Sequence, residues 1–400
     1  MEKDTEAILR RTLSDIGSEL KQNEGSPIVL NTVYLTDAEV EGECIDWLLQ
    51  YLRQKKFPTS LSYALAREVV DEISKEDISA YHEEWTPIDG EEDRESSENG
   101  CIVIKAEKLA VMAFQKLAQV CDRWKEQVPT CQHEKPNIDI FMCAIKNSRR
   151  KMEDRHAIQP EINRLFNLKG QPVQSFFAVF DGHNGTEAAN YVATHLHCNV
   201  VRHPAFKDDV TTALREGFRA TDDAFCARAR MCGDKSGTTA VVTVLQPTKL
   251  HVAWCGDSQV ALVRREQVVS CMKQHKPDDP MERDRIEKEG GAVVWLGTWR
   301  VNGMLAVSRA IGDVGQKPYV TAEPGLQTIE LDGTEDYMVL ACDGLWDVLE
   351  VEDLAKLVRE YLIETNGDKH CIAERLVKYA RNQGSSDNIT VVVVFFNHPS

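Results

Sequence analysis

Three features of membrane, secreted and cysteine-centred proteins are missing from this 400-residue chain. The longest apolar run, residues 391–396, is far shorter than the roughly 20 residues that a membrane-spanning helix needs. The twelve cysteines lie singly with no CxxC pair, which disfavours a zinc or redox centre. The first residues, MEKD, contain no apolar stretch of the kind that marks a secretory signal peptide. These absences predict an intracellular protein without membrane insertion.

Basic side chains are outnumbered by acidic ones: 47 Lys and Arg stand against 64 Asp and Glu, which gives a net charge of −17. The first hundred residues hold 24 acidic and 10 basic side chains, a net charge of −14, which leaves −3 for the rest. This length allows two domains at a usual size of roughly 100 to 200 residues. Because phosphates attract Lys and Arg, the acidic first region disfavours nucleic acid and anionic membranes and favours a protein partner.

The first region, residues 1–136, is predicted to be mainly helical. Thr36 and Glu39 have the spacing of a capping box, and apolar residues recur at helical spacing over 40–52. Two more helices are predicted over 61–73 and 109–124. Residues 89–100 (DGEEDRESSENG) have no apolar side chain, which predicts a mobile loop. An EF-hand is excluded there because the required glycine and alternating oxygen ligands are missing.

The second region, residues 137–398, is predicted to be a separate domain of the α+β class. Short β-type runs bounded by turn residues occur at 138–144, 176–180, 240–244, 251–254, 260–263, 338–341 and 389–396. Helical patterns interrupt them at 185–201, 210–228, 280–289, 351–362 and 371–381. Strands and helices that come in blocks favour antiparallel sheets over a doubly wound parallel sheet.

Acidic residues border several of these predicted strands. Asp181, Asp257 and Asp343 follow apolar runs, Asp387 precedes the last run, and Glu153 and Asp154 follow the first one. A single Asp-Gly after a strand is usually a plain turn, but several acids at strand ends can converge on one edge. Converging carboxylates are hard ligands that suit Mg²⁺ or Mn²⁺ rather than zinc.

Eight motifs occur together with these acids: RRKMEDRH at 149–156, FAVFDGHNG at 177–185, SGTTA at 236–240, GDS at 256–258, RVNG at 300–303, LAVSRAIGD at 305–313, ACDGLWDV at 341–348 and SDN at 386–388. In this order they resemble the metal-dependent type 2C protein serine/threonine phosphatases. The resemblance covers about residues 137–396. It implies a central antiparallel β-sandwich flanked by helices, with a two-metal site at one end, preceded here by the helical extension.

The resemblance also implies ligands for these metals. Asp181 would bridge two ions, the Gly182 carbonyl would bind one of them, and Asp343 and Asp387 would complete the set. Glu153 would act through bound water, while Asp154 and Asp257 would help to hold a weaker third ion. Two divalent ions can share a water, lower its pKa and direct it at phosphorus.

Two further residues acquire roles through the same resemblance. Arg149 would clamp the phosphate, since a planar guanidinium matches two phosphoryl oxygens. His183 would be the general acid that protonates the departing serine or threonine oxygen. The chain departs from common family patterns at Asn184, where glycine is frequent, and in a short connection at 314–322 that leaves substrate preference open.

The N-terminal stretch around residues 35–43 (LTDAEVEGE) is similar to the calcium/calmodulin-dependent protein kinase phosphatases. That similarity implies phosphorylated kinases as substrates, among them calmodulin-dependent and p21-activated kinases. It also implies exchange-factor scaffolds as partners and a cytoplasmic location. The basic run KNSRRK at 146–151 could also be interpreted as a nuclear-localisation patch, so a nuclear location stays open.

Two other functions remain as alternatives. Cys143 and Arg149 have the CX5R spacing of a cysteine-dependent phosphatase, although the residues between them include no glycine and Cys143 lies in an apolar run. A catalytically inactive scaffold with a phosphatase fold is the other alternative, although Asp181, Asp343 and Asp387 are all present.

Overall fold

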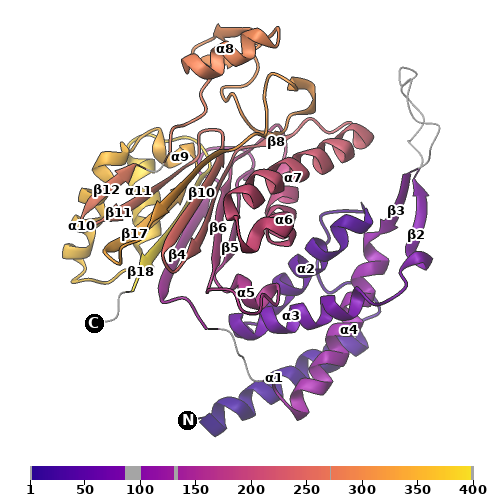
Figure 1. Cartoon of the computed structure of the whole chain (residues 1–400). Helices are drawn as coiled ribbons and strands as arrows, with labels where there is room; N and C mark the ends of the chain where they lie inside the picture. The colour runs from indigo at the N-terminus through magenta and orange to yellow at the C-terminus, as the bar shows by residue number, and fades with distance from the viewer. Residues whose placement is uncertain (1, 86–100, 130–133, 271, 398–400) are drawn as a thin grey trace. The chain divides into compact units, whose positions relative to one another are not determined.

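The computed structural model describes residues 2–85, 101–129, 134–270 and 272–397, and its contacts divide the chain into two compact units (Figure 1). The first unit comprises Met1–Glu134 together with Glu161–Gly170. The second comprises Lys135–Pro160 and Gln171–Ser400. The membership of residues 161–170 in the first unit was not predicted from the sequence. The loop predicted at 89–100 lies outside the described residues.

The first unit contains helices and a small antiparallel sheet. The helices are α1 (Glu2–Gln22), α2 (Val40–Gln54), α3 (Thr59–Ile73), α4 (Ala106–Glu126) and α5 (Ile162–Leu165). The antiparallel sheet has the order β1 (Tyr34–Leu35), β3 (Cys101–Lys105), β2 (His82–Trp85). Helix α1 packs along α4 and buries Leu13, Ile16 and Leu20. The unit therefore has an apolar core of its own.

Local sequence signals explain most of this unit. The Thr36 backbone N–H donates to Glu39 Oε2 at 2.7 Å, as the capping-box pattern predicts. The three predicted helices are confirmed as α2, α3 and α4. Helix α1 and the three-stranded sheet were not predicted.

The second unit is built on two five-stranded sheets, with antiparallel pairing between their neighbouring strands. One sheet has the order β16 (Gly325–Glu330), β10 (Lys249–Cys255), β9 (Ala240–Gln246), β6 (Ser175–Phe180), β5 (Arg155–Gln159). The other has the order β12 (Gln267–Ser270), β11 (Gln259–Arg264), β17 (Glu335–Ala341), β18 (Ile389–Phe396), β4 (Ile138–Ile145). The predicted α+β class with antiparallel sheets is confirmed.

Apolar side chains fill the space between the sheets and the space under the helices. Phe177, Val252, Leu262, Met338 and Val392 belong to the cluster that both sheets share. Helices α6 (Glu187–Arg202) and α7 (Val210–Cys232) pack on the first sheet. Helices α9 (Asp343–Trp346), α10 (Leu354–Glu364) and α11 (Ile372–Asn382) cover a second cluster on the other sheet.

Smaller elements complete this unit. Strands β7 (Gly182–His183), β8 (Gly237–Thr238) and β15 (Ile311–Gly312) form a three-stranded sheet in the order β15-β8-β7. Helix α8 (Pro280–Lys288) precedes a hairpin of β13 (Val293–Trp295) and β14 (Trp299–Val301).

The strand register places several loops at one end of the sandwich. Ala341 at the end of β17 pairs with Val391 near the start of β18, and Ile145 at the end of β4 pairs with Ile389. In the other sheet, Phe180 at the end of β6 pairs with Arg155 at the start of β5. Because antiparallel partners run in opposite directions, the end of one strand adjoins the start of the next. The acids that border these strands therefore gather at this end.

Candidate metal centre and phosphate site

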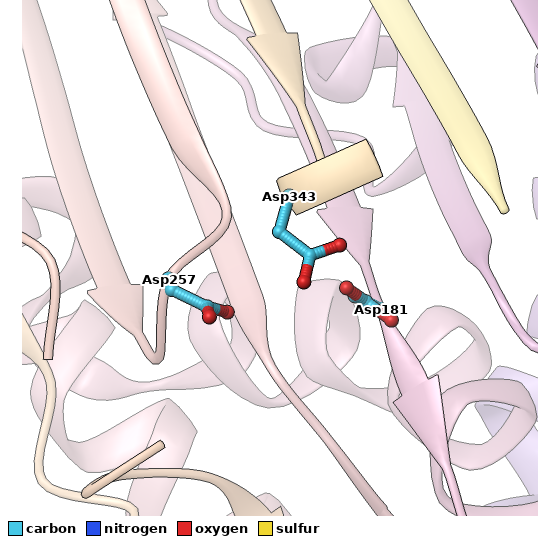
Figure 2. Close-up of side chains that lie close together, drawn as sticks. All are labelled: Asp181, Asp257 and Asp343. Carbon is cyan, nitrogen blue, oxygen red and sulfur yellow. The ribbon is translucent and has the colours of Figure 1, made fainter. Parts of the chain in front are cut away.

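Three aspartates from three strand ends converge in the second unit. Asp181 follows β6, Asp257 follows β10 and Asp343 follows β17. Each offers a carboxylate oxygen, and the three oxygens lie within 4.8 Å of one another. Figure 2 shows the three carboxylates turned toward one another. We call Asp154, Asp181, Asp257, Asp343 and Asp387 the carboxylate rim.

The protonation of these acids reflects their crowding. Desolvation raises the pKa of Asp181 well above its ordinary value, and the charges of Asp343 and Asp154 raise it further. Desolvation followed by the charge of Asp257 raises the pKa of Asp343 to about 8. The pKa of Asp154 rises to about 6, again mainly through burial. Mutual repulsion of this kind is relieved when a cation binds between the carboxylates.

Asp154 and Asp387 lie at the same end of the sandwich but outside the three-aspartate cluster. Asp154 is buried, and its Oδ2 accepts a hydrogen bond of 2.7 Å from the Thr390 hydroxyl. Its Oδ1 is buried and has no hydrogen-bond partner among the described residues. Asp387 contributes to the raised pKa of Asp154 through its charge. The structure therefore brings both acids close to the cluster without making them part of it.

Glu153 and Gly182 meet through their backbones. A Cβ atom at Gly182 would lie 2.5 Å from the Glu153 carbonyl oxygen, so no larger residue fits there without a shift. The Glu153 backbone N–H donates to Asn388 Oδ1 at 2.7 Å. These contacts fix the Glu153 backbone beside the Asp-Gly turn that carries Asp181.

Arg149 and Asp387 form an ion pair. Arg149 Nη2 lies 2.5 Å from Asp387 Oδ2, and the Arg149 side chain is 58% exposed. An exposed guanidinium can leave such a partner for an incoming anion at little cost, because exposed pairs contribute little stability. The structure thus brings together Arg149, which was predicted to bind phosphate, and Asp387, which was predicted to bind metal.

Lys276 is a residue of the site that the sequence analysis missed. Its ammonium group contacts Asp257 Oδ2, and the Asp257 carboxylate is almost fully buried. Burial acts to lower the pKa of Lys276, but the charge of Asp257 and its hydrogen bond outweigh burial, so that the pKa is raised. Lys276 lies in the loop before α8 (Pro280–Lys288), and none of the eight sequence motifs includes it.

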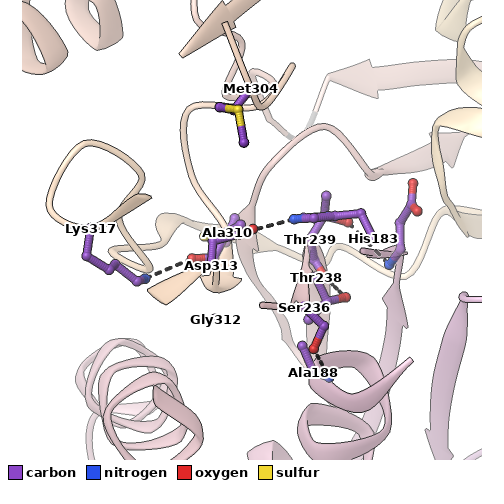
Figure 3. Close-up of polar contacts among 12 residues, drawn as sticks. His183, Ala188, Ser236, Thr238, Thr239, Met304, Ala310, Gly312, Asp313 and Lys317 are labelled. Atoms are coloured by element: carbon purple, nitrogen blue, oxygen red, sulfur yellow. Dashed lines mark hydrogen bonds and ion pairs between the residues drawn. The ribbon is translucent and has the colours of Figure 1, made fainter. Parts of the chain in front are cut away.

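His183 is paired with Asp313, as Figure 3 shows. Its Nε2 lies 2.7 Å from Asp313 Oδ2, and Asp313 is buried. The β15-β8-β7 sheet creates this contact, since His183 pairs with Gly237 and Gly237 pairs with Gly312. A Cβ at Gly237 would lie 2.0 Å from Asp313 Oδ2, so glycine is needed between them. Asp313 ends the LAVSRAIGD motif, but no role for it was predicted from the sequence.

The departure at Asn184 has a local explanation. Its φ is +58°, in the left-handed region that glycine and asparagine tolerate best. Asparagine can therefore replace the glycine that is frequent at this position without breaking the turn after His183.

Cys143 lies on β4, and its side chain packs against the apolar cluster beneath the helices. Burial raises the pKa of its thiol, and the charge of Glu374 adds to the shift. A cysteine-dependent phosphatase needs a lowered thiol pKa, because the thiolate is the nucleophile. The surroundings of Cys143 thus oppose the CX5R alternative.

The donor set of the rim fits a hard divalent cation. All three converging ligands are carboxylates, which Mg²⁺-like and Ca²⁺-like ions prefer. Asp343 Oδ1 is buried without a hydrogen-bond partner among the described residues. A buried, unpaired carboxylate oxygen is costly unless a cation or a donor satisfies it.

Comparisons with known proteins identify the family of the chain. The profile of the protein phosphatase 2C family matches residues 138–389. Human protein phosphatase 1E is 47% identical over 361 residues, which cover 90% of this chain and 47% of that protein. Human protein phosphatase 1F is 41% identical over 400 residues, which cover 99% of this chain and 88% of that protein. The chain thus spans about half the length of protein phosphatase 1E.

Two solved structures are also similar. A sex-determining protein of C. elegans has a TM-score of 0.71 at 25% identity, covering 97% of this chain and 95% of that one. The serine-threonine phosphatase 2C of Toxoplasma gondii has a TM-score of 0.59 at 23% identity, covering 68% and 98%. The second likeness concerns the fold alone.

Among the helices of the described residues, none combines the length and the apolar character needed to cross a membrane.

Proposed function

Because the chain belongs to the protein phosphatase 2C family, we propose that it hydrolyses phosphoserine and phosphothreonine in proteins with the help of Mg²⁺ or Mn²⁺ at the carboxylate rim. The family and fold predicted from the sequence are thereby confirmed. The observation that carries the proposed activity is the convergence of Asp181, Asp257 and Asp343 within 4.8 Å.

The proposed ligands are the acids at the sandwich end. Asp181, the Gly182 carbonyl, Asp343 and Asp387 would hold two ions, with Glu153 acting through water, and Asp154 and Asp257 would hold a weaker third. Bound there, divalent ions supply an activated water and neutralise charge on the phosphoryl oxygens. Lys276 competes for one oxygen of Asp257, which supports a weaker site at that residue.

Arg149 and His183 would handle the phosphate and the leaving group. Arg149 exchanges Asp387 for two phosphoryl oxygens when the substrate arrives. His183 donates a proton to the departing serine or threonine oxygen. Because Nε2 of His183 is engaged by Asp313, its Nδ1 is the nitrogen left to donate.

A phosphopeptide assay tests the proposed activity. Purified chain should release phosphate from phosphothreonine peptides with added Mn²⁺ or Mg²⁺, and EDTA should abolish the release. Cys143→Ser is the matched control and should keep full activity. Turnover that persists in EDTA but disappears in Cys143→Ser would instead establish the cysteine mechanism. An inactive scaffold would show no turnover with any metal.

The substrates that we propose are phosphorylated protein kinases, such as calmodulin-dependent and p21-activated kinases, in the cytoplasm. The first unit would dock these kinases or an exchange-factor scaffold through its acidic surface, since it carries most of the negative charge. Neutralising exposed acids of this unit, for instance Glu76→Gln with Glu84→Gln, should lower kcat/KM on an intact phosphokinase at low salt. If the wild-type chain and this double variant had equal kcat/KM on that kinase, the docking role would be rejected.

A further inference from the structure

The loop between β4 and β5 carries an unusual concentration of positive charge. Lys146, Arg149, Arg150 and Lys151 are all exposed, and we call residues 146–151 the basic turn. Arg149 pairs with Asp387, whereas Lys146, Arg150 and Lys151 form no ion pair with any described residue. The turn therefore presents three cations that no described carboxylate neutralises, in a chain with a net charge of −17.

The basic turn is held at both ends by one buried side chain. Asn388 Nδ2 donates to the Lys146 carbonyl at 2.9 Å and to the Lys151 carbonyl at 3.0 Å. Its Oδ1 accepts the Glu153 N–H at 2.7 Å, so both ends of the amide are used. Asn147, whose φ is +50°, adds a hydrogen bond of 2.7 Å to the Ser385 carbonyl. The backbone of the turn therefore has a fixed place beside the segment 385–388.

This placement connects the cations to the proposed phosphate site. Asn388 directly follows Asp387, which pairs with Arg149 of the same turn. Glu153, a proposed ligand, follows Lys151 by two residues. A phosphoryl group bound at Arg149 would thus have Arg150, Lys151 and Lys146 within the same short turn. Residues of the substrate next to the phosphoresidue would therefore lie near this turn.

We propose that the basic turn selects phosphoprotein segments with Asp or Glu next to the scissile phosphate, an inference that rests on the proposed function of the same site. Lysine ammonium groups on flexible stems are separate point charges, which suit several single carboxylates spread along a peptide. A second phosphate on the substrate would instead be bound best by several donors that converge on that one group. Charge complementarity at exposed positions acts mainly on association and specificity.

The test compares three phosphothreonine peptides of identical length. One has Asp or Glu on both sides of phosphothreonine, the second has Asn or Gln at those positions, and the third has one neighbour replaced by phosphoserine. We expect the wild-type chain with Mn²⁺ to prefer the acidic peptide in kcat/KM by about tenfold, the scale of a few exposed charge contacts. The preference should shrink toward 1 M salt, where the Debye length falls to about 3 Å.

The variant Lys146→Gln/Arg150→Gln/Lys151→Gln should lose most of this preference. Its control is Lys207→Gln/Lys356→Gln/Lys378→Gln, which removes the same charge from exposed positions elsewhere in the second unit and should keep the preference. Circular dichroism checks that both variants are folded. A wild-type chain that is active but hydrolyses acidic and neutral peptides equally would overturn the inference, and so would a far stronger preference for the doubly phosphorylated peptide. A chain inactive on all three peptides would instead overturn the proposed function.

Discussion

The acids of the first unit and those of the carboxylate rim carry the same carboxylate group in opposite surroundings. In the first unit, Glu76 faces Lys116 and Glu72 faces Arg123, each pair at least partly exposed. At the rim, Asp181, Asp257 and Asp343 face one another, and of these three only Asp257 forms an ion pair with a described residue. Exposed ion pairs are inexpensive for the fold, whereas clustered carboxylates destabilise one another. The excess of negative charge therefore lies in the first unit, whereas the acids proposed to bind metal lie in the second.

Neutralising one acid in each place should give the largest contrast. Asp343→Asn or Asp181→Asn should reduce kcat on a phosphopeptide by about 100-fold or more, the scale of removing a charged transition-state contact. The fold should survive, because asparagine has the same shape. Glu76→Gln, the matched change in the first unit, should leave kcat unchanged. Full activity in either aspartate variant would remove that residue from the proposed centre.

Asp313 is an acid of the second unit that lies outside the rim and pairs with His183, so its role can be tested separately. His183→Gln should slow a phosphopeptide by about 100-fold, within the range of general acid catalysis. It should slow para-nitrophenyl phosphate much less, because that leaving group departs without a proton. Asp313→Asn should likewise slow the hydrolysis of the phosphopeptide more than that of para-nitrophenyl phosphate. Equal slowing of the two substrates would assign His183 a structural role.

The pair of Arg149 and Asp387 resembles the ion pairs of the first unit in geometry but not in the role proposed for it. Arg149→Ala should raise KM for phosphopeptides by about tenfold with a smaller change in kcat, since it removes ground-state phosphate binding. The same variant should change the free energy of unfolding by less than about 1 kcal/mol, and so should Lys116→Ala, which breaks an ion pair of the first unit. Steady-state kinetics and urea denaturation measure both. An unchanged KM would contradict the clamp.

When metal is removed, the carboxylate rim should make stability depend on pH. The pKa of Asp343 is about 8 in the folded chain, against an ordinary value of 3.8. The folded chain then binds more protons than the unfolded chain between those pH values, so the free energy of unfolding falls as pH rises through this window. In EDTA, Tm should be a few degrees lower near pH 8 than near pH 5.

Two variants and added Mn²⁺ test whether the rim causes this change in Tm. Asp343→Asn should weaken the fall in Tm, whereas Glu76→Gln should follow the wild-type chain. Excess Mn²⁺ should raise Tm most at the higher pH. A Tm in EDTA that rises over this window in the wild-type chain, but not in Asp343→Asn, would show that the carboxylates do not repel one another as described.

Sequence patterns predicted the parts of the molecule that short-range signals specify. Apolar runs followed at once by Asp181, Asp257 and Asp343 identified both the strands and the acids that converge. Helix α1 could also have been found, because Leu13, Ile16 and Leu20 recur at helical spacing.

Other contacts left no local signal. Asp313 reaches His183 only because β8 lies between β7 and β15, and the partners are 130 residues apart. Lys276 beside Asp257 and Asn388 across the basic turn likewise depend on how separate loops meet. Such contacts follow from the register of the sheets, which periodicity alone does not determine.

The assignment of residues 161–170 to the first unit has a consequence for how the protein is made. Helix α5 packs on α3, Ile162 and Leu165 are fully buried, and Ser60 donates to Glu161. A ribosome must therefore synthesise β4 and β5 of the second unit before it can deliver the last piece of the first. Folding in order of synthesis, the usual course for successive domains, cannot finish the first unit early. For the same reason, a single protease cut between α4 and β4 would not release that unit whole.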